Sequence, residues 1–410
     1  MRILHLADTH LGIENYGRID AKTGVHTRLL DFLKCLDYAV DYALSEGADL
    51  VLFAGDAFKN RDPSETQQNA FARRIKKLAD AGIAVFLLVG NHDLPAAEGR
   101  ATALDIYHTL GIPGVTVGRE VKVYPVQTRS GPVQVAALPH LSRNALLKRE
   151  EFRGKKLEEM ELELGRLLAG YAEYLAAGLD PGAPALLTAH LSVDGAVVGS
   201  ERSIMLGGEV SLPPGVFRRP EFAYVALGHI HRQQILAEDP PLVYSGSIER
   251  VDFSEEKEPK GFMWVELEGK KARYRFVSVP ARPFITRRVR VQGAEPTAEV
   301  LAALEEDGLE GAVVRLILEG EVGLVSQVDL TAVRRLLEKK AFYVAGIQKE
   351  VSYQAALRNP GITEATDPLA ALKDYLATAK TAFKPEELLS RAEILYRRLK
   401  EGEEGKGCSG

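Results

Sequence analysis

The chain has 410 residues, a length that predicts two or three domains at roughly 100–200 residues each. Hydrophobic residues make up 46% and charged residues 27%, which is typical of a globular protein and excludes the disordered, collagen-like and coiled-coil classes. The net charge of −5 does not indicate a nucleic-acid-binding protein, which a wholly basic domain would, and it does not exclude one, because a basic stripe can lie within a near-neutral chain.

The sequence carries no signal for export or membrane insertion. Its apolar runs are all shorter than the ~20 residues that span a bilayer, and MRILHLADTH lacks the cleavage site of a signal peptide. The chain has two cysteines, Cys35 in a helical pattern and the distant Cys408 in a Gly-rich tail, so a disulfide scaffold is excluded. We therefore expect a cytoplasmic protein.

The first part of the chain alternates short apolar runs with amphipathic segments. Strands are expected at 2–7, 49–54 and 83–89, and helices at 27–44 and 64–80. This βαβαβ order predicts an α/β fold whose strands are buried on both faces.

The middle of the chain is expected to continue in the same way. A Leu-, Glu- and Ala-rich stretch at 146–178 predicts one or two long helices. Further strands are expected at 185–189, 222–227, 242–248 and 261–267, and 254–260 (SEEKEPK) is expected to be a polar turn. Pro280 and Pro283 suggest a domain boundary.

The rest of the chain predicts a smaller unit and a helical end. Strands at 284–292, 311–318 and 342–350 alternate with helices at 296–306 and 329–340, and two more helices begin near Pro368 and Pro385. We therefore expect a main domain at 1–280, a small βαβαβ domain at 281–355, a helical segment at 356–400 and a disordered tail at 401–410.

Five short polar motifs each follow a strand-like run. Because the carboxyl ends of parallel strands meet at one edge of a sheet, where ligands bind, these motifs could converge on one site. The residues are Asp8 and His10 in DTH, Asp56 in GD, Asn91, His92 and Asp93 in GNHD, His190 in AH, and His229 and His231 in GHIH.

Imidazole and carboxylate groups are the ligands of borderline divalent ions such as Mn, Fe, Zn or Co, and the motifs contain no thiolate. The set is larger than one catalytic ion needs, at about three protein ligands and a water. It suits two ions roughly 3.5–4 Å apart that share one carboxylate. A single histidine is more often an ordinary core or surface residue, so the prediction depends on the ordered set.

The order D-x-H, GD, GNHD, H, GH-x-H resembles the calcineurin-like metallophosphoesterase superfamily. Within it, MRILHLADTHLG, LFAGDAF, LLVGNHD and YVALGHIHRQQI are similar to the SbcD family, the nuclease subunits of bacterial SbcCD complexes. The motifs lie within residues 1–253. The resemblance implies an α/β metallophosphoesterase sandwich at 1–280, a capping domain at 281–355 and C-terminal helices.

The resemblance also implies two metal ions, most often manganese. It assigns one ion to Asp8, His10 and His231, and the other to Asn91, His190 and His229, with Asp56 between them. Two cations would neutralise a phosphodiester and lower the pKa of a shared water. By the same resemblance, His92 would contact the scissile phosphate and assist the leaving oxygen, and Asp93 would orient the His92 imidazole.

The sequence departs from the family pattern at Lys59, where relatives often have Asp or His after GD-x-F. Lys59 could contact a phosphate, and its presence leaves the balance of exonuclease and endonuclease activity open. Arg100, Arg143 and Lys148 are further candidate DNA contacts, although each is more often a solvated surface charge.

The SbcD resemblance implies DNA as substrate, a homodimer, and a complex with an SbcC-type ATPase that has a coiled coil. The apolar stripe of Leu388, Ala392, Leu395 and Leu399 would dock on that coiled coil, or it could pack on the chain itself. The sequence has no G-x-x-x-x-G-K-[ST] motif, so ATP binding would belong to the partner.

The leading hypothesis is a manganese-dependent double-strand DNA exonuclease and single-strand or hairpin endonuclease. The main alternative is a stand-alone phosphoesterase for a small phosphodiester or cyclic nucleotide, which would not need the roughly 130 residues after Pro280. A scaffold without metals would not need the complete ligand set. A protein serine/threonine phosphatase is disfavoured by the sequence KNR at 59–61.

Overall fold

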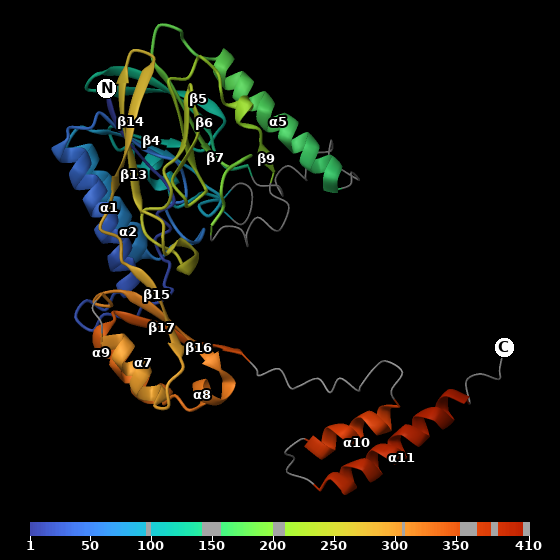
Figure 1. Cartoon of the computed structure of the whole chain (residues 1–410). Coiled ribbons are helices and arrows are strands. Elements are labelled where there is room, and N and C mark those ends of the chain that lie inside the picture. The colour runs from blue at the N-terminus through green and yellow to red at the C-terminus, as the bar shows by residue number, and fades with distance from the viewer. Residues whose placement is uncertain are drawn as a thin grey trace.

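Two six-stranded sheets lie face to face in the main domain, and a smaller three-stranded domain follows it (Figure 1). The computed structural model describes residues 1–95, 100–141, 157–199, 210–305, 308–352, 367–378 and 384–404. Within these ranges, none of the helices has the length and apolar character needed to cross a membrane. The predicted α/β sandwich is confirmed.

The first sheet contains the strands expected near the N-terminus and has α1 (Thr27–Ser45) and α2 (Glu65–Asp80) on its outer face (Figure 1). Four of its strands are parallel and two form an antiparallel hairpin at one edge. In spatial order they are β14 (Lys271–Ser278), β13 (Gly261–Glu268), β1 (Arg2–Leu6), β2 (Leu50–Phe53), β3 (Ala84–Leu88) and β4 (Val115–Gly118).

The second sheet supplies the other half of the sandwich, and α5 (Leu157–Ala177) covers its outer face. Its strands in spatial order are β11 (Gln234–Glu238), β12 (Pro241–Tyr244), β10 (Tyr224–Gly228), β7 (Ala185–His190), β6 (Gly131–Leu138) and β5 (Lys122–Thr128). The four central strands run parallel. The first part of the helix expected at 146–178 lies outside the described residues.

Alternate residues of each central strand face opposite layers of the core. In β1, Leu4 packs with α1 and α2, whereas Ile3 packs between the sheets with Phe86 and Val135. Burial on both faces explains why these strands are continuous apolar runs. The inter-sheet layer fixes the two sheets against each other, and with them the ends of their strands.

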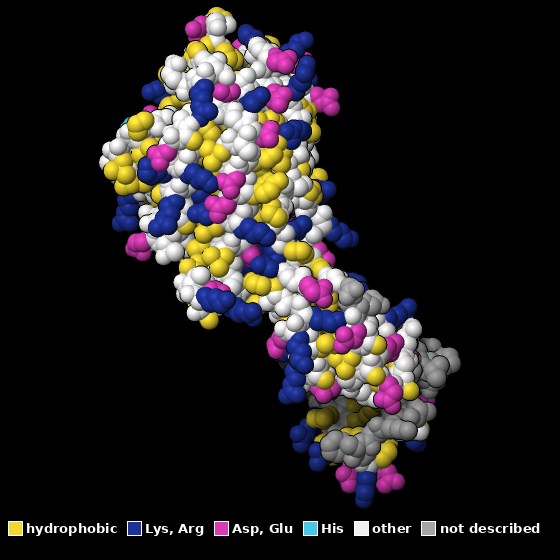
Figure 2. All heavy atoms as spheres, turned by 90° about the vertical axis from the view of Figure 1, so that its left-hand side faces the viewer, with side chains coloured by type: hydrophobic (Ala, Val, Ile, Leu, Met, Phe, Trp, Pro, Cys, Tyr) yellow, Lys and Arg dark blue, Asp and Glu magenta, His cyan; other side chains and the backbone are white. Residues whose placement is uncertain are grey.

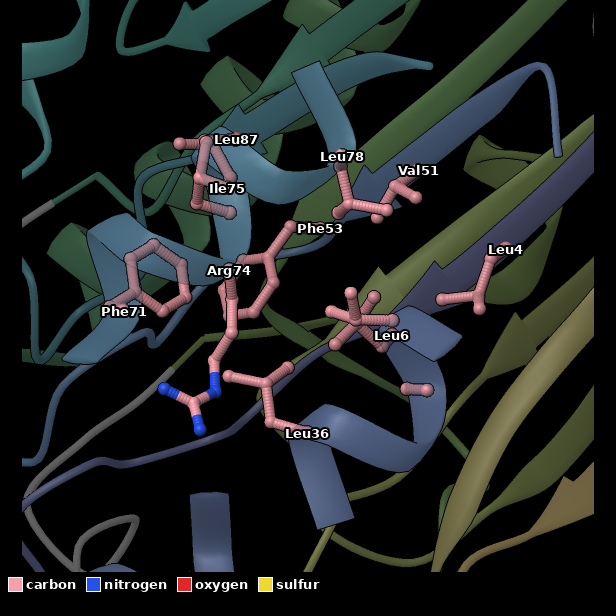
Figure 3. A pocket seen from close by; sticks show the side chains of 12 residues that line it. Leu4, Leu6, Leu36, Val51, Phe53, Phe71, Arg74, Ile75, Leu78 and Leu87 are labelled. Carbon is pink, nitrogen blue, oxygen red and sulfur yellow. The ribbon is translucent and has the colours of Figure 1, made fainter. Parts of the chain in front are cut away.

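A small cavity of about 20 Å³ lies between α1, α2 and the first sheet (Figure 3). Its walls are formed by side chains such as Leu36, Val51 and Ile75, with Arg74 at its margin. A cavity of this size could hold at most one water, and an apolar lining keeps such a void dry. It is a packing defect of the core and not a ligand site.

The small domain has one parallel sheet with helices on one face (Figure 1). Its elements in chain order are β15 (Phe284–Val291), α7 (Pro296–Glu305), β16 (Val313–Glu321), α8 (Val322–Ser326), α9 (Leu330–Lys340) and β17 (Tyr343–Ser352). This is the expected βαβαβ order with the short α8 added. The domain boundaries themselves stay predictions.

The C-terminal helices α10 (Pro368–Thr378) and α11 (Pro385–Glu404) pack against each other. Leu388 and Ala392 of the predicted stripe are half-buried, while Leu395 is 61% exposed. The side chain of Leu399 lies outside the described residues. Since α11 continues to Glu404, the expectation that a disordered tail begins at 401 is wrong for 401–404, and 405–410 lie outside the description.

Candidate metal centre

The carboxyl ends of five strands, three from one sheet and two from the other, meet at one edge of the sandwich. Hydrogen bonds join these ends directly. The main-chain N–H of Asp8 donates to the carbonyl of Gly55, 3.0 Å away, and Nδ1 of His190 donates to the carbonyl of Ala54, 2.7 Å away. The predicted convergence therefore takes place, but across two sheets and not along one.

One group of possible ligands consists of Asp8, His10 and His231. One ligand atom from each lies within 4.8 Å of the others, and all three side chains are buried. Nε2 of His10 lies 2.9 Å from Nε2 of His231. Two imidazole nitrogens that face one another in this way, beside a carboxylate, form a donor set that suits a divalent cation.

A second group consists of Asp56, His190 and His229, again with one ligand atom from each within 4.8 Å of the others. The side-chain oxygen of Asn91 lies 2.9 Å from Nε2 of His190 and 3.1 Å from Nδ1 of His229. Asn91 thus adds a possible oxygen ligand to this second group.

Asp56 lies between the two groups. Its Oδ2 atom is 3.7 Å from Nε2 of His10 and 3.2 Å from Nε2 of His190, while its Oδ1 accepts from the main-chain N–H of His92 at 2.9 Å. One carboxylate therefore faces both groups, which is the geometry that a residue shared by two ions requires.

The protonation equilibria of the site are strongly perturbed. Burial raises the pKa of Asp8 to about 6. Burial would also raise the pKa of Asp56, but the neighbouring His190 and His10 hold it well below its usual value. Burial would lower the pKa of His190, yet the Asp56 carboxylate raises it to about 10. Buried carboxylates surrounded by histidines provide a site that favours cations.

The backbone is strained where these residues lie. Asp8, His10, Asp56 and His229 have φ angles of 53°, 39°, 59° and 98°, in the left-handed region that side chains other than glycine disfavour. Such conformations persist where the surrounding structure fixes them, and they cluster at functional sites.

Two glycines in the motifs allow the strand ends to approach. A Cβ atom at Gly90 would overlap the carboxylate of Asp56, and one at Gly228 would overlap the main-chain oxygen of Ala54. The glycines in GNHD and GHIH are therefore required by close packing between loops.

His92 and Asp93 lie at the centre but differ from the expectation. Nδ1 of His92 contacts the main-chain oxygen of Lys59, 2.6 Å away, and its ring lies edge-on to His10. The Asp93 carboxylate instead accepts from the main-chain N–H groups of Asp56 at 2.9 Å and Gly90 at 3.1 Å. The carbonyl of Lys59, and not Asp93, therefore orients the His92 imidazole, while Asp93 fixes the loops.

Two further residues at the centre were not predicted. His140 follows β6, and its ring centroid lies 6.3 Å from those of His190 and His229. The sequence could have indicated His140, because it is a histidine just after a strand, as the predicted ligand histidines are. Glu255 lies 2.8 Å from Nδ1 of His231 but comes from the stretch expected to be a polar turn, where no local pattern marks a buried acid.

The candidate DNA contacts receive little support. Arg100 is exposed, Lys59 is half-buried, and Arg143 and Lys148 lie outside the described residues. The face of the molecule seen in Figure 2 carries interspersed basic and acidic side chains and no single basic surface. This agrees with the near-neutral net charge.

Comparison with known proteins identifies the family. Residues 1–233 match the family model of the calcineurin-like phosphoesterases. The chain belongs to the calcineurin-like phosphoesterase family.

Its relatives in this family include two bacterial SbcD proteins, named as subunits of the nuclease SbcCD. The one from Rhodobacter capsulatus is 32% identical over 74% of this chain and 75% of that protein, and the one from Bacillus subtilis is 27% identical over 82% of each. The Haloferax volcanii DNA double-strand break repair protein Mre11 is 28% identical over 78% of this chain and 62% of that protein. Within the family, the chain groups with the SbcD proteins.

Proposed function

We propose that the chain is the nuclease subunit of an SbcCD-type DNA repair complex. In this proposal it hydrolyses DNA phosphodiesters with manganese, as a double-strand exonuclease and a single-strand or hairpin endonuclease, in the cytoplasm. The observation that carries the proposal is the pair of ligand groups joined by Asp56, found in a chain whose relatives are named as nuclease subunits.

The proposed ligands fit two divalent ions by their chemistry. Asp8, His10 and His231 would hold one ion, Asn91, His190 and His229 the other, and Asp56 would serve both. All are oxygen or imidazole donors, which Mn²⁺ accepts, as do Fe²⁺ and Zn²⁺. Bound ions would supply Lewis-acid neutralisation of the phosphodiester and would lower the pKa of a coordinated water.

The chain itself would position the substrate and supply a proton. Because Nδ1 of His92 donates to the carbonyl of Lys59, its Nε2 atom is left for the substrate. A protonated His92 would donate from Nε2 to the leaving oxygen, a contribution of typically 10²–10⁴-fold. Asp93 would keep the Asp56 and Gly90 loops in place through its contacts with their main-chain N–H groups.

The proposed partners follow the names of the relatives. An SbcC-type ATPase would bind α10 and α11 through apolar side chains that remain exposed, such as Ile394 and Leu395. The small domain at 281–355 would act as the capping domain above the DNA, and two copies of the chain would join in a heterotetramer with SbcC.

The test is cleavage of end-labelled duplex DNA with Mn²⁺, Mg²⁺ or EDTA, comparing the wild type with Asp56→Ala. We expect a nucleotide ladder with Mn²⁺ that EDTA and the variant abolish, because one carboxylate serves both ions. Full activity of Asp56→Ala would contradict the two-metal assignment. A parallel assay with a small aryl phosphodiester tests the alternative function. If the chain hydrolyses that ester but does not cleave DNA even when SbcC and ATP are present, it is a small-molecule phosphodiesterase.

A further inference from the structure

A short helical turn, η3 (Phe253–Glu255), lies between the metal centre and the small domain. Glu255, the last residue of η3, and Glu256, the residue after it, face different structures. Glu255 contacts His231 and is fully buried, whereas Glu256 contacts β15 of the small domain. We propose that η3 connects the small domain to the metal centre, with Glu255 as the positioning residue for His231.

The contact on the metal side involves a charge network. Oε1 of Glu255 accepts from Nδ1 of His231 at 2.8 Å, and Oε2 forms an ion pair with Nζ of Lys260, also at 2.8 Å. Lys260 in turn donates to the main-chain oxygen of His231 at 3.1 Å. The side chain and the main chain of one histidine are thus both held by this network. A carboxylate that accepts from one imidazole nitrogen fixes the ring so that the other nitrogen faces the metal.

The contact on the other side fixes the small domain. The Glu256 carboxylate accepts from the main-chain N–H of Thr286 at 2.7 Å and from its hydroxyl at 2.6 Å. The ring of Phe253 packs edge-on against Phe284, with centroids 5.0 Å apart, and the guanidinium of Arg315 stacks over Phe253. Two of these partners belong to β15, the strand of the small domain next to the main domain (Figure 1).

The segment around η3 is held by several hydrogen bonds to one side chain, through which a displacement at one end would reach the other. Arg250 donates to the main-chain oxygens of Glu255 at 3.2 Å, Glu258 at 2.8 Å and Arg282 at 3.0 Å. One guanidinium therefore binds the last residue of η3, the chain just after it and the chain that enters the small domain. In this proposal, a movement of β15 would displace Glu256, and the adjacent Glu255 would be displaced with it.

The inference rests on the proposed ligation by His231 and is tested on the full chain by metal binding. Calorimetric titration with Mn²⁺ and the absorption spectrum of bound Co²⁺ report on the sites without any cleavage assay. We expect Glu255→Gln to weaken one of two sites by about 10- to 100-fold and to change the Co²⁺ spectrum. Lys260 keeps its ion pair with Glu258, 3.2 Å away, in this variant. Denaturant unfolding of Glu255→Gln and the wild type in EDTA separates a folding defect from a positioning effect.

The connection to the small domain is tested by Glu256→Gln and Thr286→Val. We expect each to weaken the same Mn²⁺ site by about 2- to 30-fold and leave the other site unchanged. The matched control is Arg288→Gln, on the same strand, whose partners Glu319 and Glu350 lie within the small domain. It should leave both sites unchanged.

A third variant, Asp8→Ala, distinguishes a failure of this inference from a failure of the proposed function. Asp8→Ala should remove one Mn²⁺ ion from the binding stoichiometry, and unchanged stoichiometry would overturn both the ligand assignment and the inference. If Asp8→Ala loses an ion while the Glu255 and Glu256 variants keep wild-type affinity and Co²⁺ spectrum, the inference alone is wrong. A lower unfolding stability with unchanged metal binding would likewise give the network a purely structural role.

Discussion

Nδ1 of His190, from the second sheet, lies 2.7 Å from the main-chain oxygen of Ala54, at the end of a strand of the first sheet. A carbonyl only accepts, so Nδ1 carries a hydrogen and Nε2 is the atom that faces Asp56, 3.2 Å away. With the pKa of His190 raised to about 10 by Asp56 against the effect of burial, Nε2 also carries a proton at neutral pH.

Metal binding at this site should therefore release a proton, because an imidazole must be neutral to coordinate. At pH 8 we expect about one proton from His190 for each ion bound there. Asp8 belongs to the other ligand group, so as the pH falls through about 6, the pKa of Asp8, binding of the ion held there should release a proton from Asp8, and the apparent affinity for that ion should drop. Calorimetry of Mn²⁺ binding in two buffers of different ionisation enthalpy measures the release. Heats that do not depend on the buffer would contradict the prediction. The control is His108→Gln, which changes an exposed histidine of the short helix α3 (Asp105–Thr109) and should leave the release unchanged.

The His92→Gln variant should bind metals but cleave poorly. Glutamine cannot transfer a proton to the leaving oxygen, so we expect the cleavage rate to fall by about 10²–10⁴-fold. Mn²⁺ stoichiometry should stay at the wild-type value. Loss of an ion in this variant would instead make His92 a ligand, which its place beside His10 and Asp56 allows.

The sequence was sufficient to predict the strands that carry the centre. Apolar runs such as 49–54 and 83–89 are buried on both faces, so their pattern is strong and their ends are well defined. The motifs that follow them were found for the same reason. The hairpin of β5 and β6 was not predicted, because β5 is largely exposed and its apolar pattern is weak.

The contacts between distant segments could not be predicted. Nothing near residue 255 shows that Glu255 and Lys260 are buried, since both lie in a stretch rich in charged residues. Their burial depends on an ion pair that forms only when β13 and the GHIH loop are in place. The same holds for the main-chain oxygen of Lys59, whose contact with His92 depends on the fold and not on the side chain at that position.

Gly228→Ala should destabilise the sandwich. Because the new methyl group would overlap the main-chain oxygen of Ala54, we expect a loss of about 1–3 kcal/mol in the free energy of unfolding. Gly170→Ala is the matched control, since Gly170 is in α5 with open space around its Cα and should gain about 0.5–1 kcal/mol. Denaturant unfolding in EDTA measures both. A Gly228→Ala variant as stable as the wild type would show that the loops can separate at no cost in free energy.

Removing residues 367–410 should spare the metal centre and abolish the capture of SbcC, if α10 and α11 are the docking segment. A sharper version is Leu395→Asp, which places a charge on an apolar side chain that is 61% exposed on α11. Ser390→Asp adds the same charge to an exposed polar position of the same helix and is the control. We expect co-purification with SbcC to be lost for the truncated chain and for Leu395→Asp, and to be kept for Ser390→Asp, with Mn²⁺ binding the same in all. A truncated chain that still binds SbcC would place the docking surface on another part of the protein.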